Sequence, residues 1–267
     1  MPVPADPQAL AAETARVYDI CAGCRRCYNL CPSFTTLLDL IDDQHDGEAQ
    51  LTPDENRKVV DLCFSCKLCY PHCPYTPPHR WSIDFPRLMQ QAKIARAASE
   101  GIPLRERLLG NPERLGRLAS RMPGLANWAM RHRVLRMLAE RWLGIDSRRT
   151  LPRYSRSFAD WFRRQAAPPG VGRNGTVALF VTTPVEYNVP DTGRAAVRVL
   201  WRSGIAVRYP AQVCCGMPAL DGGDVAGATR RARLNIDSLD REVAAGCDIV
   251  VPGPTWLRRA RAAYPRR

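Results

Sequence analysis

Eight of the eleven cysteines in this chain fall into two runs with the same spacing. The first run holds Cys21, Cys24, Cys27 and Cys31, and the second holds Cys63, Cys66, Cys69 and Cys73. In each run a proline follows the fourth cysteine, which completes the pattern C-x2-C-x2-C-x3-C-P. This is the spacing of thiolates that hold two [4Fe–4S] clusters, where the fourth cysteine of each run ligates the other cluster.

The pattern therefore predicts the ligands of two clusters. Cluster one takes Cys21, Cys24, Cys27 and Cys73, and cluster two takes Cys63, Cys66, Cys69 and Cys31. Structural zinc is the main alternative, but zinc sites usually combine two separated CxxC or CxxH pairs. A third cysteine continues each pair here, which favours iron–sulfur. Disulfides are disfavoured because the chain begins without a secretory segment, and closely spaced cysteines in such a chain are typical of metal ligands.

Charged residues inside the cysteine runs have two interpretations. Arg25, Arg26 and Lys67 can raise a cluster's reduction potential or dock a partner, or they can simply face solvent. His72 is expected to be a packed or exposed histidine, because the eight cysteines already complete two clusters.

Composition and charge limit the possible classes of protein. The chain of 267 residues is 45% hydrophobic, which is enough for a buried core in one to three domains. No apolar run is long enough to predict a transmembrane helix, and we expect a cytoplasmic protein. Residues 101–175 carry 16 Lys/Arg against 5 Asp/Glu, which supplies most of the total net charge of +13. Such a segment can meet anionic lipid or an acidic partner, or be a solvated helical face. No nucleic-acid-binding module is present, so we expect no nucleic-acid partner.

Residues 1–100 predict an α-helical domain around the cysteines. Helices are expected over 7–19, 34–41, 53–61 and 83–99, separated by a loop over 42–50. Thr52, Pro53 and Glu55 form the sequence signature of a capping box at the third helix. Because the segment between the two runs carries helix signals, we expect an α-helical ferredoxin domain.

Residues 101–175 predict a basic spacer of broken amphipathic helices. Prolines at 103, 112 and 123 divide it, and arginines occupy the faces opposite the apolar residues. The apolar positions are Leu104, Leu108, Leu115, Leu118, Met122, Trp128, Val134, Leu135, Met137, Leu138 and Trp142. This pattern is compatible with interfacial membrane binding, or with a helical linker that packs on its neighbouring domains.

Residues 176–267 predict a small parallel α/β domain. Strands are expected over 176–182, 205–209 and 248–251, with helices over 191–203 and 224–244 and another from Pro254. Ligands of such sheets bind at the carboxyl ends of the strands. Cys214 and Cys215 follow the second strand, at that edge, where they could approach a metal or a disulfide substrate or could simply be two small buried residues. Cys247 is expected to be a buried hydrophobe.

Taken together, these motifs resemble the CCG-domain iron–sulfur oxidoreductases. The resemblance rests on the two cysteine runs, the Arg-rich spacer and the segments 186–193, 213–220, Asn235 and 248–255. The group includes the C subunit of anaerobic glycerol-3-phosphate dehydrogenase, glycolate oxidase iron–sulfur subunits and heterodisulfide reductase subunits. The resemblance implies an electron-transfer subunit that passes electrons from a flavoprotein dehydrogenase partner to a quinone or other acceptor. It also implies a cytoplasmic protein that can attach peripherally to the inner face of the membrane.

The chain departs from the pattern of this group at the CCG motif. Thr183 stands where the group has an upstream cysteine, and residues 253–256 replace its downstream cysteine pair. Because a cluster needs about four protein ligands, Cys214 and Cys215 are interpreted as a vestigial site. Only one CCG half is present, so we expect a specialised short form or a truncated product. The main hypothesis is a non-catalytic electron-transfer subunit. The alternative is an oxidoreductase whose CCG domain acts directly on a disulfide or similar substrate.

Overall fold

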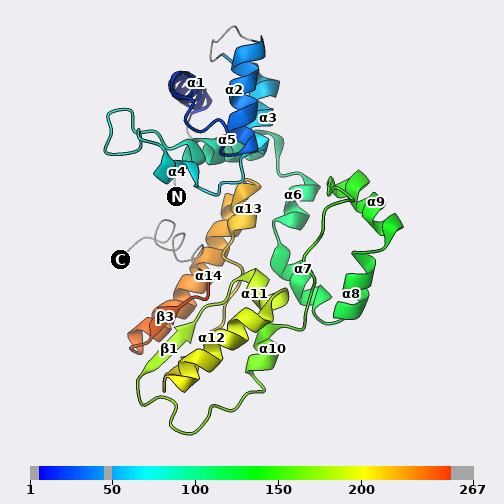
Figure 1. Cartoon of the computed structure of the whole chain (residues 1–267), viewed down its shortest axis with the longest axis vertical. Coiled ribbons are helices and arrows are strands. Elements are labelled where there is room, and N and C mark those ends of the chain that lie inside the picture. The colour runs from blue at the N-terminus through cyan, green and yellow to red at the C-terminus, as the bar shows by residue number, and fades with distance from the viewer. Residues whose placement is uncertain (1–5, 45–49, 254–267) are drawn as a thin grey trace. The chain divides into compact units, whose positions relative to one another are not determined.

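The structure is a computed structural model that describes residues 6–44 and 50–253. It divides into two compact units. Figure 1 labels their helices and strands and colours the chain by residue number. The first unit comprises Met1–Pro103 together with the short stretch Leu220–Val225. The second comprises Leu104–Ala219 and Ala226–Arg267. The division into three domains at residues 100 and 175 stays a prediction.

The first unit is built from helices. They are α1 (Pro7–Cys24), α2 (Pro32–Gln44), α3 (Pro53–Asp61), α4 (Cys69–His72) and α5 (Phe85–Glu100). The starts of three helices are fixed by side chains that accept hydrogen bonds from first-turn amides: Asp6 at α1, Thr52 at α3 and Asp84 at α5. At α3 the predicted capping box is confirmed, because Glu55 also accepts a hydrogen bond from the Thr52 amide at 2.8 Å.

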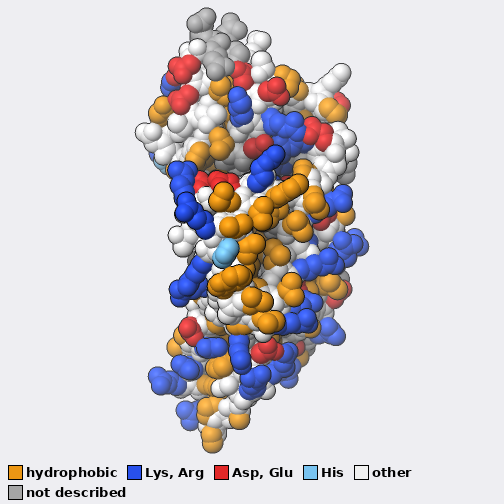
Figure 2. Space-filling view, turned by 90° about the vertical axis from the view of Figure 1, so that its right-hand side faces the viewer, with side chains coloured by type: hydrophobic (Ala, Val, Ile, Leu, Met, Phe, Trp, Pro, Cys, Tyr) orange, Lys and Arg blue, Asp and Glu red, His pale blue; other side chains and the backbone are white. Residues whose placement is uncertain are grey.

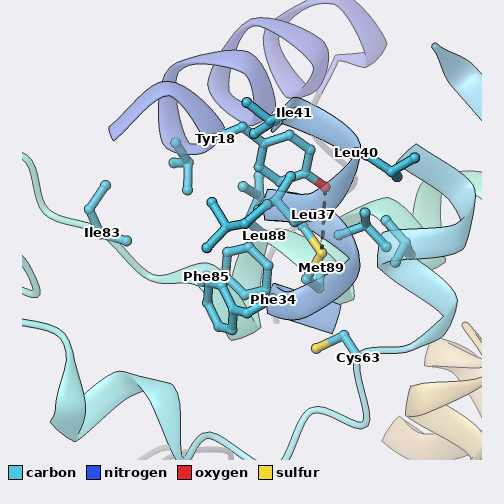
Figure 3. Packing of buried hydrophobic residues seen from close by; sticks show 14 residues of the cluster. Tyr18, Phe34, Leu37, Leu40, Ile41, Cys63, Ile83, Phe85, Leu88 and Met89 are labelled. Atoms are coloured by element: carbon cyan, nitrogen blue, oxygen red, sulfur yellow. Dashed lines mark hydrogen bonds between the residues drawn. The ribbon is translucent and has the colours of Figure 1, made fainter. Parts of the chain in front are cut away.

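The core of the first unit lies where α1, α2, α3 and α5 meet (Figure 3). The Phe34 and Phe85 rings stack with their centroids 4.2 Å apart. The Tyr18 hydroxyl donates a hydrogen bond to the Asn56 side-chain oxygen at 2.7 Å and lies 4.0 Å from the sulfur of Met89. Cys63 belongs to this core, and Cys21, Cys27, Cys31, Cys69 and Cys73 pack against it. The cysteine runs are therefore part of the wall of the core.

The second unit contains a three-stranded parallel sheet. Its strands are β1 (Thr176–Leu179), β2 (Ala206–Arg208) and β3 (Asp248–Val250), in the spatial order β2-β1-β3. Thr176 pairs with Ala206, and Val177 pairs with Asp248. The chain runs from the central strand to one side and then returns to the other. The topological switch point of the sheet therefore lies between the carboxyl ends of β1 and β3. Ligands of open α/β sheets bind outside the carboxyl ends of the strands.

Helices make up the remainder of the second unit. They are α6 (Leu104–Leu109), α7 (Pro112–Ala119), α8 (Pro123–Ala129), α9 (Arg133–Leu143), α10 (Phe158–Phe162), α11 (Thr183–Tyr187), α12 (Pro190–Arg202), α13 (Met217–Asp221) and α14 (Val225–Ala244). The end of α13 and the first residue of α14 count with the first unit. Phe158 is fully buried against Trp161, Phe162 and Tyr209, and this cluster joins α10 to the sheet.

The face formed by α6–α9 presents apolar side chains to solvent. Figure 2 shows hydrophobic side chains gathered in a band on this face, with Lys and Arg on both sides. Every apolar residue that the sequence predicted for these amphipathic helices is exposed, and Leu125 is exposed as well. Trp142 is 77% exposed and Leu104 71%. The helices are amphipathic as predicted, but the structure does not bury their apolar side chains.

Most of the expected elements are present with shifted ends. Helix α1 continues to Cys24, because nothing between residue 19 and Cys24 stops a helix before Arg25 adopts a left-handed conformation with φ 55°. The strands are shorter than expected, since the chain turns into α11 soon after Leu179. Helices α4, α11 and α13 were not predicted, because each is a single short turn. The helix expected from Pro254 lies outside the described residues.

No helix in the described ranges is long and apolar enough to cross a membrane. The structure is thus a helix-rich fold with a small parallel sheet, as the sequence indicated.

A substitution at Gly116 tests the packing of α7 against α11. A Cβ at Gly116 would lie 2.3 Å from the buried Tyr187 ring, so Gly116→Ala should lower stability by about 1–3 kcal/mol through overpacking. Gly124→Ala, on the neighbouring α8, is the matched control because no atom lies within 4 Å of its added Cβ. Thermal unfolding of both variants measures the difference, and an equal Tm for the two would contradict this packing.

Candidate metal centre

The first cysteine run bridges the end of one helix and the start of the next. Cys21 and Cys24 lie on the last turn of α1, and the Arg25 amide donates a hydrogen bond to the Cys21 carbonyl at 2.8 Å. Cys27 follows in a turn, where its carbonyl accepts a hydrogen bond from Leu30. Cys31 directly precedes α2, which begins with Pro32. The expected loop is thus partly helical at its start.

The second cysteine run bends more sharply. Cys63 follows α3, and Cys66 is flanked by Ser65 and Lys67, which adopt left-handed conformations with φ 50° and 61°. Non-glycine residues rarely take this conformation, and it marks functional sites more often than chance. Cys69 begins the short helix α4, and the Cys73 amide closes it with a hydrogen bond to the Cys69 carbonyl.

Cysteines from both runs converge in one pocket. Its lining includes Cys21, Cys24, Cys27, Cys73 and Cys69, together with apolar side chains from the core such as Phe34 and Phe85. On the other side, Cys31 lies near Cys63 and Cys69, whose ionisation it opposes. Cys73 thus lies with the first run and Cys31 near the second. This arrangement supports the crosswise ligand assignment, which stays a prediction.

The protonation of these thiols follows from their burial and from one another. Burial, with added repulsion from neighbouring cysteines, raises the pKa of Cys21 to about 12 and that of Cys27 to about 11. The pKa of Cys69 is raised further for the same reasons. Without metal, these groups are neutral thiols at neutral pH. Metal binding therefore has to displace protons, which couples the loading of the site to pH.

The cysteines do not form a site for one ion. Within residues 6–44 and 50–253, no group of three or more His, Cys, Asp or Glu converges to hold a single metal ion. In a cubane the four cysteines bind four different irons, so they stand farther apart than the ligands of one ion. The donor set of eight thiols beside an apolar core fits two such clusters.

A buried ion pair supports the second run. The Lys93 ammonium on α5 is 8% exposed and donates a hydrogen bond to the Cys63 carbonyl at 2.6 Å. It also pairs with Asp221 at 3.0 Å, and the Ser65 hydroxyl donates to the same carboxylate at 2.9 Å. These contacts fix the backbone on both sides of Phe64 and place positive charge behind the run.

The second unit holds the Cys214–Cys215 pair on the loop after β2, as predicted. Cys214 is buried and Cys215 is partly exposed. Cys247 is buried, which confirms its expected character. Thr183 begins α11, while residues 254–256 lie outside the described chain.

Comparison with known proteins identifies the N-terminal part of the chain. Residues 14–99 match the family described as citrate utilization protein B Fer4-like domain. This segment is therefore similar to a Fer4-like domain and is called the Fer4-like domain below. The match covers both cysteine runs and the helices that position them.

Curated relatives extend the similarity beyond the Fer4-like domain. The chain is 30% identical over 165 residues to the C subunit of anaerobic glycerol-3-phosphate dehydrogenase of Escherichia coli (strain K12), which covers 61% of this chain and 41% of the relative. It is 38% identical over 65 residues to "Lactate utilization protein A" of Bacillus pumilus (strain SAFR-032), covering 24% of this chain and 27% of the relative. The alignments thus span less than half of each relative's length. No solved structure gave a significant match. The resemblance to this iron–sulfur group is confirmed.

The charged residues inside the cysteine runs lie on the surface of the Fer4-like domain. Arg25 forms an exposed ion pair with Asp42, and Lys67 is exposed. A His72 ring nitrogen lies 3.4 Å from the Arg26 carbonyl, an exposed contact between the two runs. Sequence analysis missed Lys93. The sequence feature that could have revealed Lys93 is its spacing. It lies four residues after Met89, so both side chains are on the same face of α5, the face that packs inward.

Lys93→Met should lower the reduction potential of an iron–sulfur centre held by the second run by tens of millivolts. The buried ammonium favours the added negative charge of the reduced state, and little solvent screens it. Lys67→Met removes an exposed charge from the same run and should shift the potential less. Redox titration followed by EPR measures both.

The double variant Lys93→Met/Asp221→Asn separates charge from position. It removes the ion pair without changing net charge, so its potential should return towards the wild-type value. A potential unchanged in Lys93→Met would contradict an electrostatic role for this ion pair.

Proposed function

We propose that this protein is an electron-transfer subunit that holds two [4Fe–4S] clusters in its Fer4-like domain. The domain match and the relatives support an iron–sulfur protein with an electron-transfer role. The observation that carries the finer proposal is the gathering of Cys73 with Cys21, Cys24 and Cys27 around one pocket. A single cluster held by the first run alone would not require Cys73 there.

The residues of the chain have distinct parts in this proposal. Cys21, Cys24, Cys27 and Cys73 would hold cluster one, and Cys63, Cys66, Cys69 and Cys31 would hold cluster two. When bound, such clusters exchange one electron each over a range of potentials that the protein sets. The core formed by Phe34, Phe85 and their neighbours excludes water from one side of the site. Cys66 is exposed, which leaves a side where a partner can approach.

The partners belong to the same proposal. The donor would be a flavoprotein dehydrogenase subunit, and the acceptor a quinone or another carrier. The name of one relative, the C subunit of a dehydrogenase, supports a place in a multi-subunit complex. Direct action of the CCG motif on a disulfide is the weaker candidate. Outside the two runs the sequence has only Cys214, Cys215 and Cys247, and a further cluster needs about four protein ligands.

Iron content and EPR spectra test the two-cluster proposal. Anaerobically reconstituted protein should bind about eight irons and, after reduction with dithionite, give two interacting [4Fe–4S]⁺ signals. Cys73→Ala and Cys21→Ala should lose the same signal and about four irons, whereas Cys31→Ala should lose the other. Cys247→Ala is the control and should retain all the iron, because Cys247 is buried in the second unit.

Two results would overturn the proposal or its ligand assignment, and a third would favour the CCG alternative. Wild-type protein without any redox-active cluster would overturn it. If Cys73→Ala and Cys63→Ala lost the same signal, each run would serve its own cluster and the crosswise assignment would be wrong. Iron in clear excess of eight, abolished by changing Cys214 and Cys215, would instead favour the CCG alternative.

A second proposal concerns peripheral membrane attachment through the α6–α9 face. Leucine, methionine and tryptophan side chains are exposed along this face, and arginines surround them (Figure 2). Residues 101–175 have a net charge of +11. Interfacial helices combine an apolar face with Lys and Arg, and they bind best to anionic lipid. This arrangement supports attachment to a membrane surface that carries negative charge.

Vesicle flotation tests this attachment. The wild-type holoprotein should float with vesicles that contain phosphatidylglycerol, float less with phosphatidylcholine alone, and be released by salt. Leu118→Glu/Trp142→Glu places charge on the apolar face and should abolish flotation. Val199→Glu, at a residue 63% exposed on α12, is the matched control and should float like the wild type. Wild-type protein that stays unbound to both vesicles would refute the attachment.

A further inference from the structure

The second unit has a cleft of about 860 Å³ at the carboxyl ends of its strands. Its lining includes Val181 and Thr183 after β1, and Tyr209, Gln212 and Cys214 after β2. The cleft therefore lies at the carboxyl edge of the sheet, beside β1 and β2. Its volume is within the range of small-molecule sites, about 300–1,000 Å³. Nothing in the electron-transfer proposal uses it.

The loop that carries Cys214 is held rigidly by buried side chains. Asn235, which has no exposed surface, accepts a hydrogen bond from the Val213 amide at 2.9 Å and donates one to the Val213 carbonyl at 3.1 Å. Gln212 accepts a hydrogen bond from the Val181 amide and donates one to the Leu179 carbonyl. The Glu113 carboxylate accepts the Cys214 amide hydrogen bond at 2.9 Å.

Gly216 completes the restraint on this loop. It has φ +84°, and a Cβ there would lie 3.0 Å from the Ala228 backbone. Only glycine fits this backbone without strain, and it brings the loop against α14. The sulfur of Cys214 is thus placed by the fold before any ligand binds.

The Cys214 sulfur has an environment that favours its charged form. It accepts hydrogen bonds from the Cys215 thiol, the Thr183 hydroxyl and the Gly216 amide, and the Arg231 guanidinium adds positive charge. The Cys215 contact is the largest cause, and together these groups lower the pKa of Cys214 to about 6 although burial opposes them. One Arg231 nitrogen, Nη1, is buried and has no hydrogen-bond partner among the described residues.

Three arginines line the cleft, together with Glu113, Asp160 and Glu186. Arg117 and Arg163 lie there but are paired with Glu113 and Asp160. Arg121 is exposed at the end of α7, and within the described chain no acidic side chain forms an ion pair with it. Arginine binds carboxylates through paired hydrogen bonds, so Arg121 can hold a carboxylate at the mouth of the cleft.

We propose that this cleft binds a small carboxylate that bears an electrophilic carbon, with Arg121 at the carboxylate and the Cys214 sulfur as nucleophile. In the reaction a sulfur–carbon bond forms, and the leaving group departs with the electron pair of the broken bond. The reacting form is the Cys214 thiolate, which the donors around the sulfur stabilise, and the proton of the thiol passes to solvent. Thr183 is a positioning residue that stabilises the sulfur through its hydroxyl. The site is independent of the iron–sulfur clusters.

Alkylation by two matched reagents tests the proposal on the full-length holoprotein under anaerobic conditions. Iodoacetate carries a carboxylate and iodoacetamide does not, and both release iodide. Peptide mass spectrometry follows Cys214, Cys215 and Cys247. Cys214 should react first, and its iodoacetate-to-iodoacetamide rate ratio should exceed that of a free thiol by about tenfold, as a charge-assisted contact implies. Cys214→Ser should abolish the fast reaction.

Two further variants separate the roles of Arg121 and Thr183. Arg121→Gln should reduce the rate ratio to that of a free thiol without moving the pH midpoint of iodoacetamide labelling. Thr183→Val should move that midpoint to higher pH and leave the ratio unchanged, because the thiolate loses a donor. Thr182→Val is the matched control and should change neither value. Labelling of Cys247 before Cys214, or a wild-type ratio equal to that of a free thiol, would overturn the proposal.

Discussion

The constraint on which the first unit depends is the convergence of eight thiols from two runs that 31 residues separate in the sequence. Burial and mutual repulsion oppose the ionisation of Cys21, Cys27 and Cys69, so metal binding has to displace their protons. Helices α2 and α3 lie between the two runs in the sequence and pack against each other, which brings the second run back beside the first. The stacked Phe34 and Phe85 rings belong to the core next to the cysteines. The core and the candidate metal centre are therefore one structural feature, and metal binding and folding are expected to be coupled.

The cysteines have different surroundings in the two units. In the first unit, cysteines line an apolar wall, and Lys93 supports the backbone from behind. In the second, Cys214 lies on a loop fixed by Asn235 and Gln212, with hydrogen-bond donors directed at its sulfur. The resemblance to the iron–sulfur group predicts that Thr183 replaces a cysteine of that group. A hydroxyl there stabilises a thiolate without metal, which changes the chemistry that the same loop can perform.

The surface formed by the basic helices α6–α9 depends on the prolines and the glycine in this segment. Proline begins α7 and α8, and each helix is only two or three turns long. Gly116 lets α7 approach Tyr187 closely, so α7 packs against α11 on that side while its leucines face solvent. Contiguous exposed apolar patches are rare on monomeric proteins, so the band on this face supports the attachment that we propose for it.

The sequence by itself determined the cysteine pattern, the helices that surround it, the capping box at α3 and the parallel sheet. These features depend on spacing, periodicity and local capping, which involve residues that are close in the sequence. Only the tertiary structure placed Cys73 beside the first run, paired Lys93 with Asp221, exposed the apolar face of α6–α9 and directed Thr183 at Cys214. Each of these depends on residues that are distant in sequence, and no local pattern records which distant side chain will be near. Helix ends such as Cys24 also needed the structure, because the left-handed Arg25 that stops α1 has no marker in the sequence.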